Sequence, residues 1–230
     1  MMALLPWGAY EQHGPLLPSN VDTTIAKYVA DQLHRMYPDS ILLEPLTYGV
    51  SIEHAGFAGT ISMDYKVAID MLENILLSIT ANDSKPDLVV IVNGHGGNQA
   101  VASLVCQNLN YRSLGTKFVV FHVFPEKSRL FAKTLFGHFS AHADSTEASV
   151  YAAIDDSIAE GEYKLSAFGG TISRPHAMSL FPVREISACG IVSKSEAIII
   201  DKHKGRLLLE NMVQGISEAL DDIKKSLEDV

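Results

Sequence analysis

The feature that most constrains this chain is an apolar run at 87–93 that leads directly into a glycine-rich turn. Positions 88–92 are all apolar, and the turn reads Asn-Gly-His-Gly-Gly-Asn over 93–98. A strand without polar alternation is typical of a parallel sheet that is buried on both faces. The sequence therefore predicts a buried parallel strand here, and with it an α/β fold.

The rest of the chain alternates between short β-rich runs and amphipathic helical stretches. Strands are predicted at 3–7, 41–45 and 118–121, and apolar residues recur at helical spacing over 25–36, 67–79 and 209–227. Further helices are expected over 145–159 and after Asn98, which would act as N-cap and be followed by inward-facing Val101, Leu104 and Val105. This alternation implies a parallel sheet between layers of helices, with the binding crevice beyond the carboxyl ends of the strands.

The chain contains no linker, internal repeat or low-complexity tract, so we expect a single domain over 1–230. Its 47% hydrophobic and 20% charged residues are typical of a soluble globular protein. A chain of this length can bury a core without disulfides or a structural metal. The two cysteines, Cys106 and Cys189, cannot form a disulfide scaffold.

Charge and targeting signals exclude several classes of partner. With 18 basic and 27 acidic residues the net charge is −9, and no Lys/Arg run stands out, which disfavours nucleic acid and anionic membranes as partners. The start, Met1–Trp7, lacks the basic segment of a signal peptide. No stretch reaches the roughly 20 apolar residues of a membrane span. A cytoplasmic protein is the resulting expectation.

A first polar cluster follows the first predicted strand. Glu11 and His13 are two residues apart, so in extended chain their side chains point the same way. Asp22 lies nine residues after His13, at the start of the first helix. This mixed nitrogen and oxygen set suits Zn, Mn or Fe(II) better than Ca or Mg. The alternative is a helix-capping Asp22, a surface Glu11 and an incidental His13.

Two more clusters follow later strands. His95 stands in the glycine-rich turn after 87–93, where a metal ligand is favoured over a core histidine, because such a turn is a poor place to bury one. His142 and Glu147 stand at the entrance to the helix predicted at 145–159. The helix dipole alone would account for Glu147. That explanation weakens because all three clusters fall at strand ends.

The segment 48–60 follows the second strand and shares the same rim. Its Ser51, Glu53 and His54 are candidates for a substrate pocket, although a surface loop would have the same composition. Gly96 of the glycine-rich turn and His138, close to the third cluster, are further pocket candidates. His34 and His122 are expected to be core or surface residues.

Taken in order, these motifs resemble the creatininase (creatinine amidohydrolase) family. The family shows Gly-x-x-Glu-Gln-His-Gly-Pro-His-Leu-Pro and Asp, then Tyr-Gly-x-Ser-x-Glu-His, Phe-Pro-Gly-Thr, Asn-Gly-His-Gly-Gly-Asn and His-Ala-Gly…Glu-Thr-Ser. This chain carries matching segments at 8–18 with Asp22, and at 48–54, 57–60, 93–98 and 142–149. The resemblance implies a creatininase-like three-layer α/β/α sandwich with a mostly parallel central sheet. It also implies a homo-oligomer, which is a hexamer in the best-known members.

The resemblance implies two divalent metal ions per subunit, with zinc, manganese and iron as candidates. By position, Glu11 and His95 would bind one ion and His13 and Glu147 the other, while Asp22 would bridge them. All five implied ligand positions are therefore filled.

The chain departs from the family pattern around the pocket. Leu16 replaces the second histidine of His-Gly-Pro-His, and Ala58 replaces the proline of Phe-Pro-Gly-Thr. Gly96 and Gly97, and later His138, stand where creatininase carries other pocket residues. These differences disfavour creatinine itself as the substrate.

The resemblance implies hydrolysis of a C–N bond in a small amide, lactam or formamide. A hydroxide shared by the two ions would attack the carbonyl carbon, and His142 would protonate the leaving nitrogen. Alternatives are a formamide deformylase of flavin or deazaflavin synthesis, a peptide-processing member and a non-catalytic member. The motif loops contain no Arg or Lys, which favours a neutral or small substrate over a phosphate-bearing one.

Overall fold

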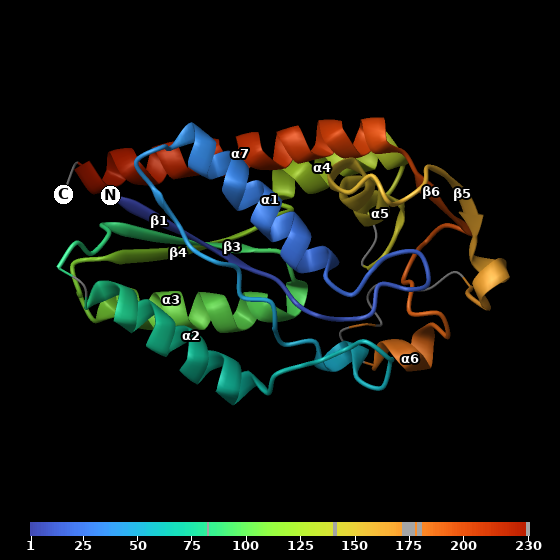
Figure 1. Cartoon of the computed structure of the whole chain (residues 1–230), viewed down its shortest axis with the longest axis horizontal. Coiled ribbons are helices and arrows are strands. Elements are labelled where there is room, and N and C mark those ends of the chain that lie inside the picture. Colours follow the sequence, from blue (N-terminus) through green and yellow to red (C-terminus); the bar gives the residue numbers. More distant parts are fainter. Residues whose placement is uncertain (82, 140–141, 172–177, 179–180, 229–230) are drawn as a thin grey trace.

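The computed structural model describes residues 1–81, 83–139, 142–171, 178 and 181–228. Four parallel strands form the central sheet in the order β2-β1-β3-β4 (Figure 1). Their bounds are Met2–Trp7 for β1, Ile41–Leu42 for β2, Leu88–Asn93 for β3 and Lys117–His122 for β4. The predicted parallel sheet and its buried strand β3 are confirmed.

Helices cover both faces of this sheet, as the predicted three-layer sandwich requires (Figure 1). One layer holds α2 (Tyr65–Thr80) and α3 (Gln99–Tyr111). The other holds α1 (Val21–Met36), α4 (Glu126–Phe136), α5 (Ser145–Ile154) and α7 (Lys202–Glu228). A short helix α6 (Val183–Ile186) and an antiparallel pair of strands, β5 (Gly161–Lys164) and β6 (Ala197–Ile200), lie at the end opposite both termini.

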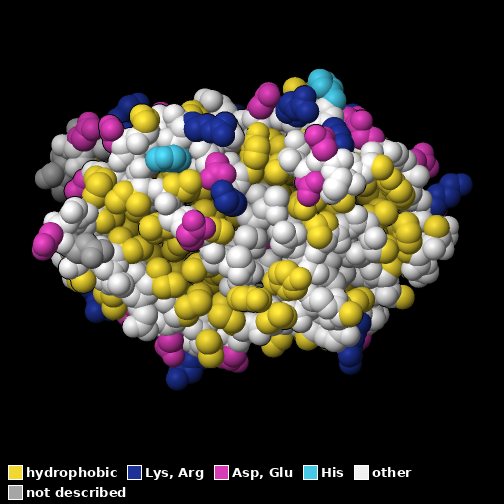
Figure 2. All heavy atoms as spheres, viewed as in Figure 1, with side chains coloured by type: hydrophobic (Ala, Val, Ile, Leu, Met, Phe, Trp, Pro, Cys, Tyr) yellow, Lys and Arg dark blue, Asp and Glu magenta, His cyan; other side chains and the backbone are white. Residues whose placement is uncertain are grey.

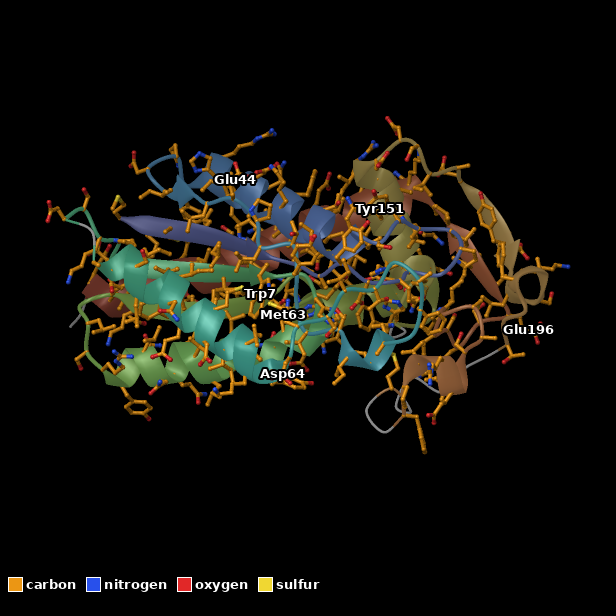
Figure 3. All side chains as sticks on the ribbon, turned by 60° about the horizontal axis from the view of Figure 1, so that its bottom comes forward. Trp7, Glu44, Met63, Asp64, Tyr151 and Glu196 are labelled. Atoms are coloured by element: carbon orange, nitrogen blue, oxygen red, sulfur yellow. The ribbon has the colours of Figure 1, made fainter. Side chains whose placement is uncertain are left out.

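The core follows from the alternation of side chains along the strands. In β1 and β3, Leu4, Val90 and Val92 pack with α1, α5 and α7, whereas Leu5 and Ile91 pack with α2 and α3. Trp7 also points to the α2 and α3 side, where it is fully buried and its Nε1 donates to the Tyr48 carbonyl (Figure 3). Two separate hydrophobic layers therefore hold the sheet in place.

The strand register brings the functional loops together. Trp7 of β1 pairs with Asn93 of β3, and Asn93 pairs with His122 of β4. The three strands therefore end side by side, and the segments that follow them leave from one edge of the sheet. In Figure 1 both termini lie at the opposite edge.

Several local predictions need correction. Leu104 is 54% exposed, because it lies on the outer side of α3, while Val101 and Val105 are buried as expected. Asn98 does not cap α3 with its side chain, which bonds instead to the Val50 amide and the Gly8 carbonyl.

Two element boundaries also differ from the predictions. Helix α5 ends at Ile154 rather than at 159, because Asp155 leaves the helical conformation and accepts from the Ser157 amide. Strand β2 is shorter than predicted, although the chain stays beside β1 as far as the bridge between Trp7 and Leu46.

The surface carries mixed charge. On the face in Figure 2, the described Lys and Arg side chains are scattered among Asp and Glu, and hydrophobic side chains are frequent over α2 and α3. Asp64, at the start of α2, caps that helix by accepting from the Lys66 amide (Figure 3). Among the described helices, none combines the length and the apolar character that crossing a membrane requires.

Candidate metal centre

Five predicted ligands converge at the carboxyl edge of the sheet. Glu11 and His13 come from the loop after β1, Asp22 from the first turn of α1, His95 from the loop after β3 and Glu147 from the first turn of α5. Four are buried, and the Glu147 side chain is 16% exposed. The loops after β1 and β3 meet because these parallel strands end together. Glu147 was expected at the end of a strand, but it follows helix α4 instead.

A close backbone contact fixes two of these segments. A Cβ on Gly94 would lie 2.2 Å from the main-chain oxygen of Asp22. Only glycine therefore lets the loop after β3 pack against the first turn of α1. This contact brings His95 within reach of Asp22.

Asp22 lies between two histidines and offers one oxygen to each. Its Oδ2 is 3.2 Å from His95 Nδ1, and its Oδ1 is 3.4 Å from His13 Nε2. Glu11 Oε1 is 3.4 Å from the same His95 nitrogen, and Glu147 Oε2 is 3.6 Å from the same His13 nitrogen. The five side chains therefore form two overlapping groups that share Asp22.

The second nitrogen of each histidine is held by the main chain. His95 Nε2 donates to the Val50 carbonyl at 2.8 Å, and His13 Nδ1 donates to the Glu11 carbonyl at 3.1 Å. These bonds leave His95 Nδ1 and His13 Nε2 facing the carboxylates, where each nitrogen can carry a proton or bind a metal ion. Metal-binding histidines are commonly oriented in this way.

Three atoms of this cluster are buried and have no hydrogen-bond partner among the described residues: Glu11 Oε2, His13 Nε2 and Asp22 Oδ2. An unsatisfied buried polar group costs about 1–3 kcal/mol, so such groups normally have a partner. A cation would satisfy all three. The imidazole and carboxylate donors fit Zn, Mn or Fe(II).

The pKa shifts show how strongly the cluster attracts positive charge. Burial by itself lowers the pKa of His13, but Asp22 and Glu147 outweigh it and raise that pKa well above the usual value. Glu11 and Asp22 likewise outweigh burial and raise the pKa of His95. Burial raises the pKa of the Asp22 carboxyl, but His13 and His95 hold it below its usual range. The carboxylates that hold protons on these histidines would equally hold a divalent ion.

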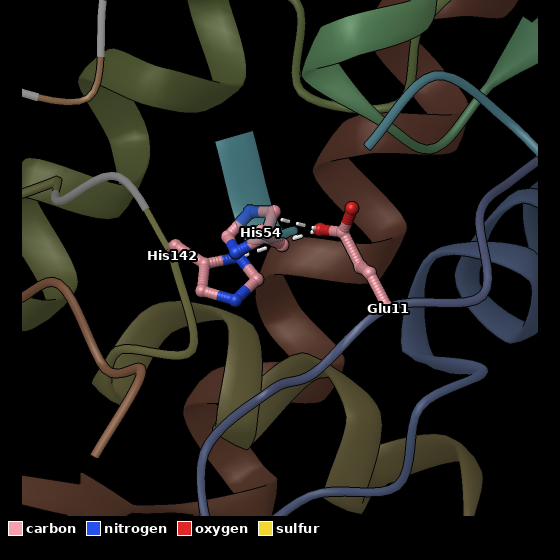
Figure 4. Close-up of side chains that lie close together, drawn as sticks. All are labelled: Glu11, His54 and His142. Carbon is pink, nitrogen blue, oxygen red and sulfur yellow. Dashed lines mark ion pairs between the residues drawn. The ribbon is translucent and has the colours of Figure 1, made fainter. Parts of the chain in front are cut away.

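His54 and His142 lie beside Glu11 in the same cluster (Figure 4). His54 Nε2 and His142 Nδ1 are 3.3 and 3.6 Å from Glu11 Oε1, and the two rings are 4.1 Å apart. Burial, with help from His95 and His13, lowers the pKa of His54 to about 3. Burial, with help from His54 and His13, also lowers the pKa of His142 well below its ordinary value.

Gln12, which was not among the predicted site residues, holds these two histidines. Its Nε2 donates to His54 Nδ1 at 2.8 Å and to the Gly190 carbonyl at 3.1 Å. Its main-chain carbonyl accepts from His142 Nε2 at 2.7 Å. The one available signal is its position between Glu11 and His13.

A cavity of about 420 Å³ opens onto the cluster. Of the predicted pocket residues, Glu53, His54 and Gly96 line it together with His142. Ser51 and His138 are not among the described residues that line it. Ser51 is buried behind the cluster, with its Oγ 3.5 Å from His95 Nε2.

The cavity wall also includes residues that no motif marked. They come mainly from β4, α4 and the segments beside them, and they are His122, Phe124, Arg129, Phe139, Met178 and Lys194. His122 was expected in the core or on the surface, but it lines the cavity. The motif loops contain no Lys or Arg, but the cavity wall does contain Arg129 and Lys194.

The chain is similar to one protein family over nearly its whole length. A family model described as "Creatininase: Creatinine amidohydrolase" matches residues 1–220. Over 237 residues the chain is 24% identical to a creatinine amidohydrolase of Pseudomonas putida, covering 94% of this chain and 87% of that protein.

Higher identity over shorter stretches is found to mycofactocin precursor peptide peptidases. The chain is 35% identical over 155 residues to the one from Mycolicibacterium smegmatis, covering 65% of this chain and 56% of the relative. Identity to the one from Mycobacterium ulcerans is 41% over 104 residues, covering 41% of this chain and 40% of the relative. The chain therefore spans about half the length of these relatives.

Solved structures share the fold. A structure described as creatinine amidohydrolase (creatininase) has a TM-score of 0.73 and 23% identity, covering 96% of this chain and 89% of that chain. A mutant creatininase described as Zn-Zn type has a TM-score of 0.75 and 22% identity, covering 96% of this chain and 90% of that chain. At 22% and 23% identity, the likeness to these structures shows that the fold is shared.

Proposed function

The chain belongs to the creatininase family, and from this premise we propose that it is a metal-dependent amidohydrolase that cleaves the C–N bond of an amide. The observation that carries the proposal is the set of three buried atoms without hydrogen-bond partners, Glu11 Oε2, His13 Nε2 and Asp22 Oδ2. Two divalent ions, with zinc, manganese and iron as candidates, are the partners that we assign to them.

In this proposal the five ligands are assigned to the two ions according to the contacts among their side chains. Glu11 and His95 would hold one ion, His13 and Glu147 would hold the other, and Asp22, which contacts both histidines, would be shared between them. When bound, such ions would supply Lewis acidity for the carbonyl and a water of lowered pKa. The Val50 and Glu11 carbonyls keep the two ligand imidazoles in place through their second nitrogens.

His142 is the proton carrier in this proposal. Its pKa lies well below the ordinary value, so the ring is neutral at pH 7, and its Nε2 donates to the Gln12 carbonyl. The lone pair of Nδ1 therefore faces Glu11 and the centre of the site. In that state His142 can accept a proton from the attacking water and then deliver it to the leaving nitrogen.

Cleavage of a peptide is the second candidate, and one observation favours it. The chain is 35% identical over 155 residues to a mycofactocin precursor peptide peptidase, against 24% over 237 residues for creatinine amidohydrolase. Both candidates need the same bond cleavage and the same metal ligands. They differ in what the cavity admits beyond the scissile amide.

The test uses the full chain stripped of metal and reloaded with Zn, Mn or Fe(II). A panel of small amides, lactams, formamides and short peptides is assayed for release of ammonia, formate or amine. We expect hydrolysis that disappears on chelation and returns with at least one of the three ions. Hydrolysis by the stripped protein, or no hydrolysis by any loaded form, would contradict the proposal.

A further inference from the structure

We propose that the substrate carries a carboxylate close to the scissile amide and that Arg129 binds this carboxylate. The inference rests on the proposed function, because it concerns the cavity that opens onto the candidate metal centre. Arg129 belongs to α4 and lines that cavity. Neither the sequence motifs nor the proposed chemistry gives it a role.

Arg129 is an exposed residue, and two contacts orient its guanidinium at the cavity wall. Its Nε donates to the Phe124 carbonyl at 2.9 Å, and its Cζ lies 5.8 Å from the centre of the Phe139 ring. The rings of Phe124 and Phe139 meet edge to face at 5.5 Å. The planar group is therefore oriented before any ligand binds, which reduces the entropy lost on binding.

The outer nitrogens of Arg129 remain available for a ligand. Among the described residues, no carboxylate pairs with Arg129, and its one hydrogen bond uses Nε. The two Nη groups of an arginine can bind both oxygens of a carboxylate in parallel, which gives strong and directional recognition. A phosphate dianion generally takes more donors than a single guanidinium, so a carboxylate is the better match.

The charge of the cavity supports an anion once metal is present. In the described part of the chain, five carboxylates line the metal-free cavity, those of Glu11, Asp22, Glu53, Asp144 and Glu147. Two divalent ions would offset four of these five negative charges, and the basic side chains of the wall would then make the net charge positive. Lys194 adds a second basic side chain to the wall. Anion binding is therefore expected to depend on metal loading. This differs from the neutral substrate that the motif loops favour, because Arg129 lies on a helix outside them.

Calorimetric binding of three probes to the metal-loaded full chain tests the proposal. The probes are N-acetylglycine, its uncharged amide N-acetylglycinamide, and N-acetyl-O-phosphoethanolamine. We expect N-acetylglycine to bind at least about tenfold more tightly than the amide, as suits a charge-assisted bidentate contact. In Arg129→Gln this preference should fall below about threefold. The matched control is Lys127→Gln, which removes the same charge from the same helix outside the cavity wall and should keep the preference.

Several results would overturn the proposal. These are equal binding of the acid and its amide, no binding of any probe, tighter binding of the phosphate probe, or a carboxylate preference that survives in Arg129→Gln. The last result would indicate that the metal ions, rather than Arg129, bind the carboxylate of the probe. If Arg129→Gln does not fold, Arg129→Lys replaces it, and an unchanged preference in that variant would also overturn the proposal.

Binding calorimetry and the hydrolysis panel together separate the two proposals. Hydrolysis of neutral amides without a carboxylate preference would remove this inference and leave the proposed function standing. If the metal-loaded protein shows a carboxylate preference that depends on Arg129 but hydrolyses no amide, the proposed function would fail and this inference would stand.

Discussion

Replacing Asn98 with alanine tests how the loops around the site are held together. The buried Asn98 side chain accepts from the Val50 amide and donates to the Gly8 carbonyl, both at 2.9 Å. Val50 in turn accepts from His95 Nε2. One amide group thus joins the loops after β1, β2 and β3.

The magnitude follows from the two main-chain groups that the alanine would leave without partners. Each costs about 1–3 kcal/mol when buried and unsatisfied, so Asn98→Ala should lower the free energy of unfolding by roughly 2–6 kcal/mol. That is a large part of the 5–15 kcal/mol that is typical of a folded domain. Val50 orients His95, so loss of the bond between Asn98 and Val50 should also weaken metal binding. We expect a loss of about tenfold or more, as is common when a group that orients a metal ligand is disturbed.

The matched control is Asn110→Ala. Asn110 also makes two main-chain bonds, with the Phe118 carbonyl and amide at 2.8 Å, but it lies at the far end of α3 beside the start of β4. Urea unfolding gives the stability of each variant, and competition with a metal-sensitive dye gives its metal affinity. Both variants should lose stability, but only Asn98→Ala should lose metal affinity. The reasoning fails if Asn98→Ala loses less than about 1 kcal/mol, or if both variants bind metal equally well.

Three further predictions concern pH, thiol chemistry and helix capping. Burial, with help from Arg129, lowers the pKa of His122 to about 4, so between pH 6.5 and 4 the unfolded chain binds more protons than the folded one. The free energy of unfolding should fall by up to roughly 3 kcal/mol as the pH drops through this window, and His122→Gln should remove that part of the slope in urea titrations. Burial raises the pKa of the Cys106 thiol to about 12, so at pH 8 iodoacetamide should label the less buried Cys189 first, as read by peptide mass spectrometry. Asp144→Ala removes the N-cap of α5 and should cost about 1 kcal/mol and reduce metal affinity, whereas Asp64→Ala at α2 should cost about the same with metal affinity unchanged.

Much of the fold follows from the sequence for a simple physical reason. The strand at 88–93 is apolar at almost every position because helices cover both faces of the sheet, and this pattern is readable without a structure. The meeting of Glu11 and His95 follows from the rule that parallel strands end at one edge, whereas Glu147 reaches the site only after the intervening helix α4.

Other features depend on contacts that no local pattern shows. The end of α5 is set by Asp155 and its bond to the Ser157 amide, which the apolar spacing does not record. Arg129 enters the cavity wall from α4, a helix that the sequence analysis did not predict, and His122 enters it because β4 ends beside β3. These placements arise from packing between distant segments.

The central claim is that this cluster of carboxylates and histidines binds two divalent ions, and elemental analysis of the purified chain tests it most directly. The account predicts two divalent ions per wild-type chain, and loss of bound metal together with turnover in His13→Ala and in Asp22→Ala. Asp31→Ala removes another carboxylate of α1, one that pairs with Lys27 outside the cluster, and should keep both ions. Two ions retained in either His13→Ala or Asp22→Ala would contradict the assignment of the site.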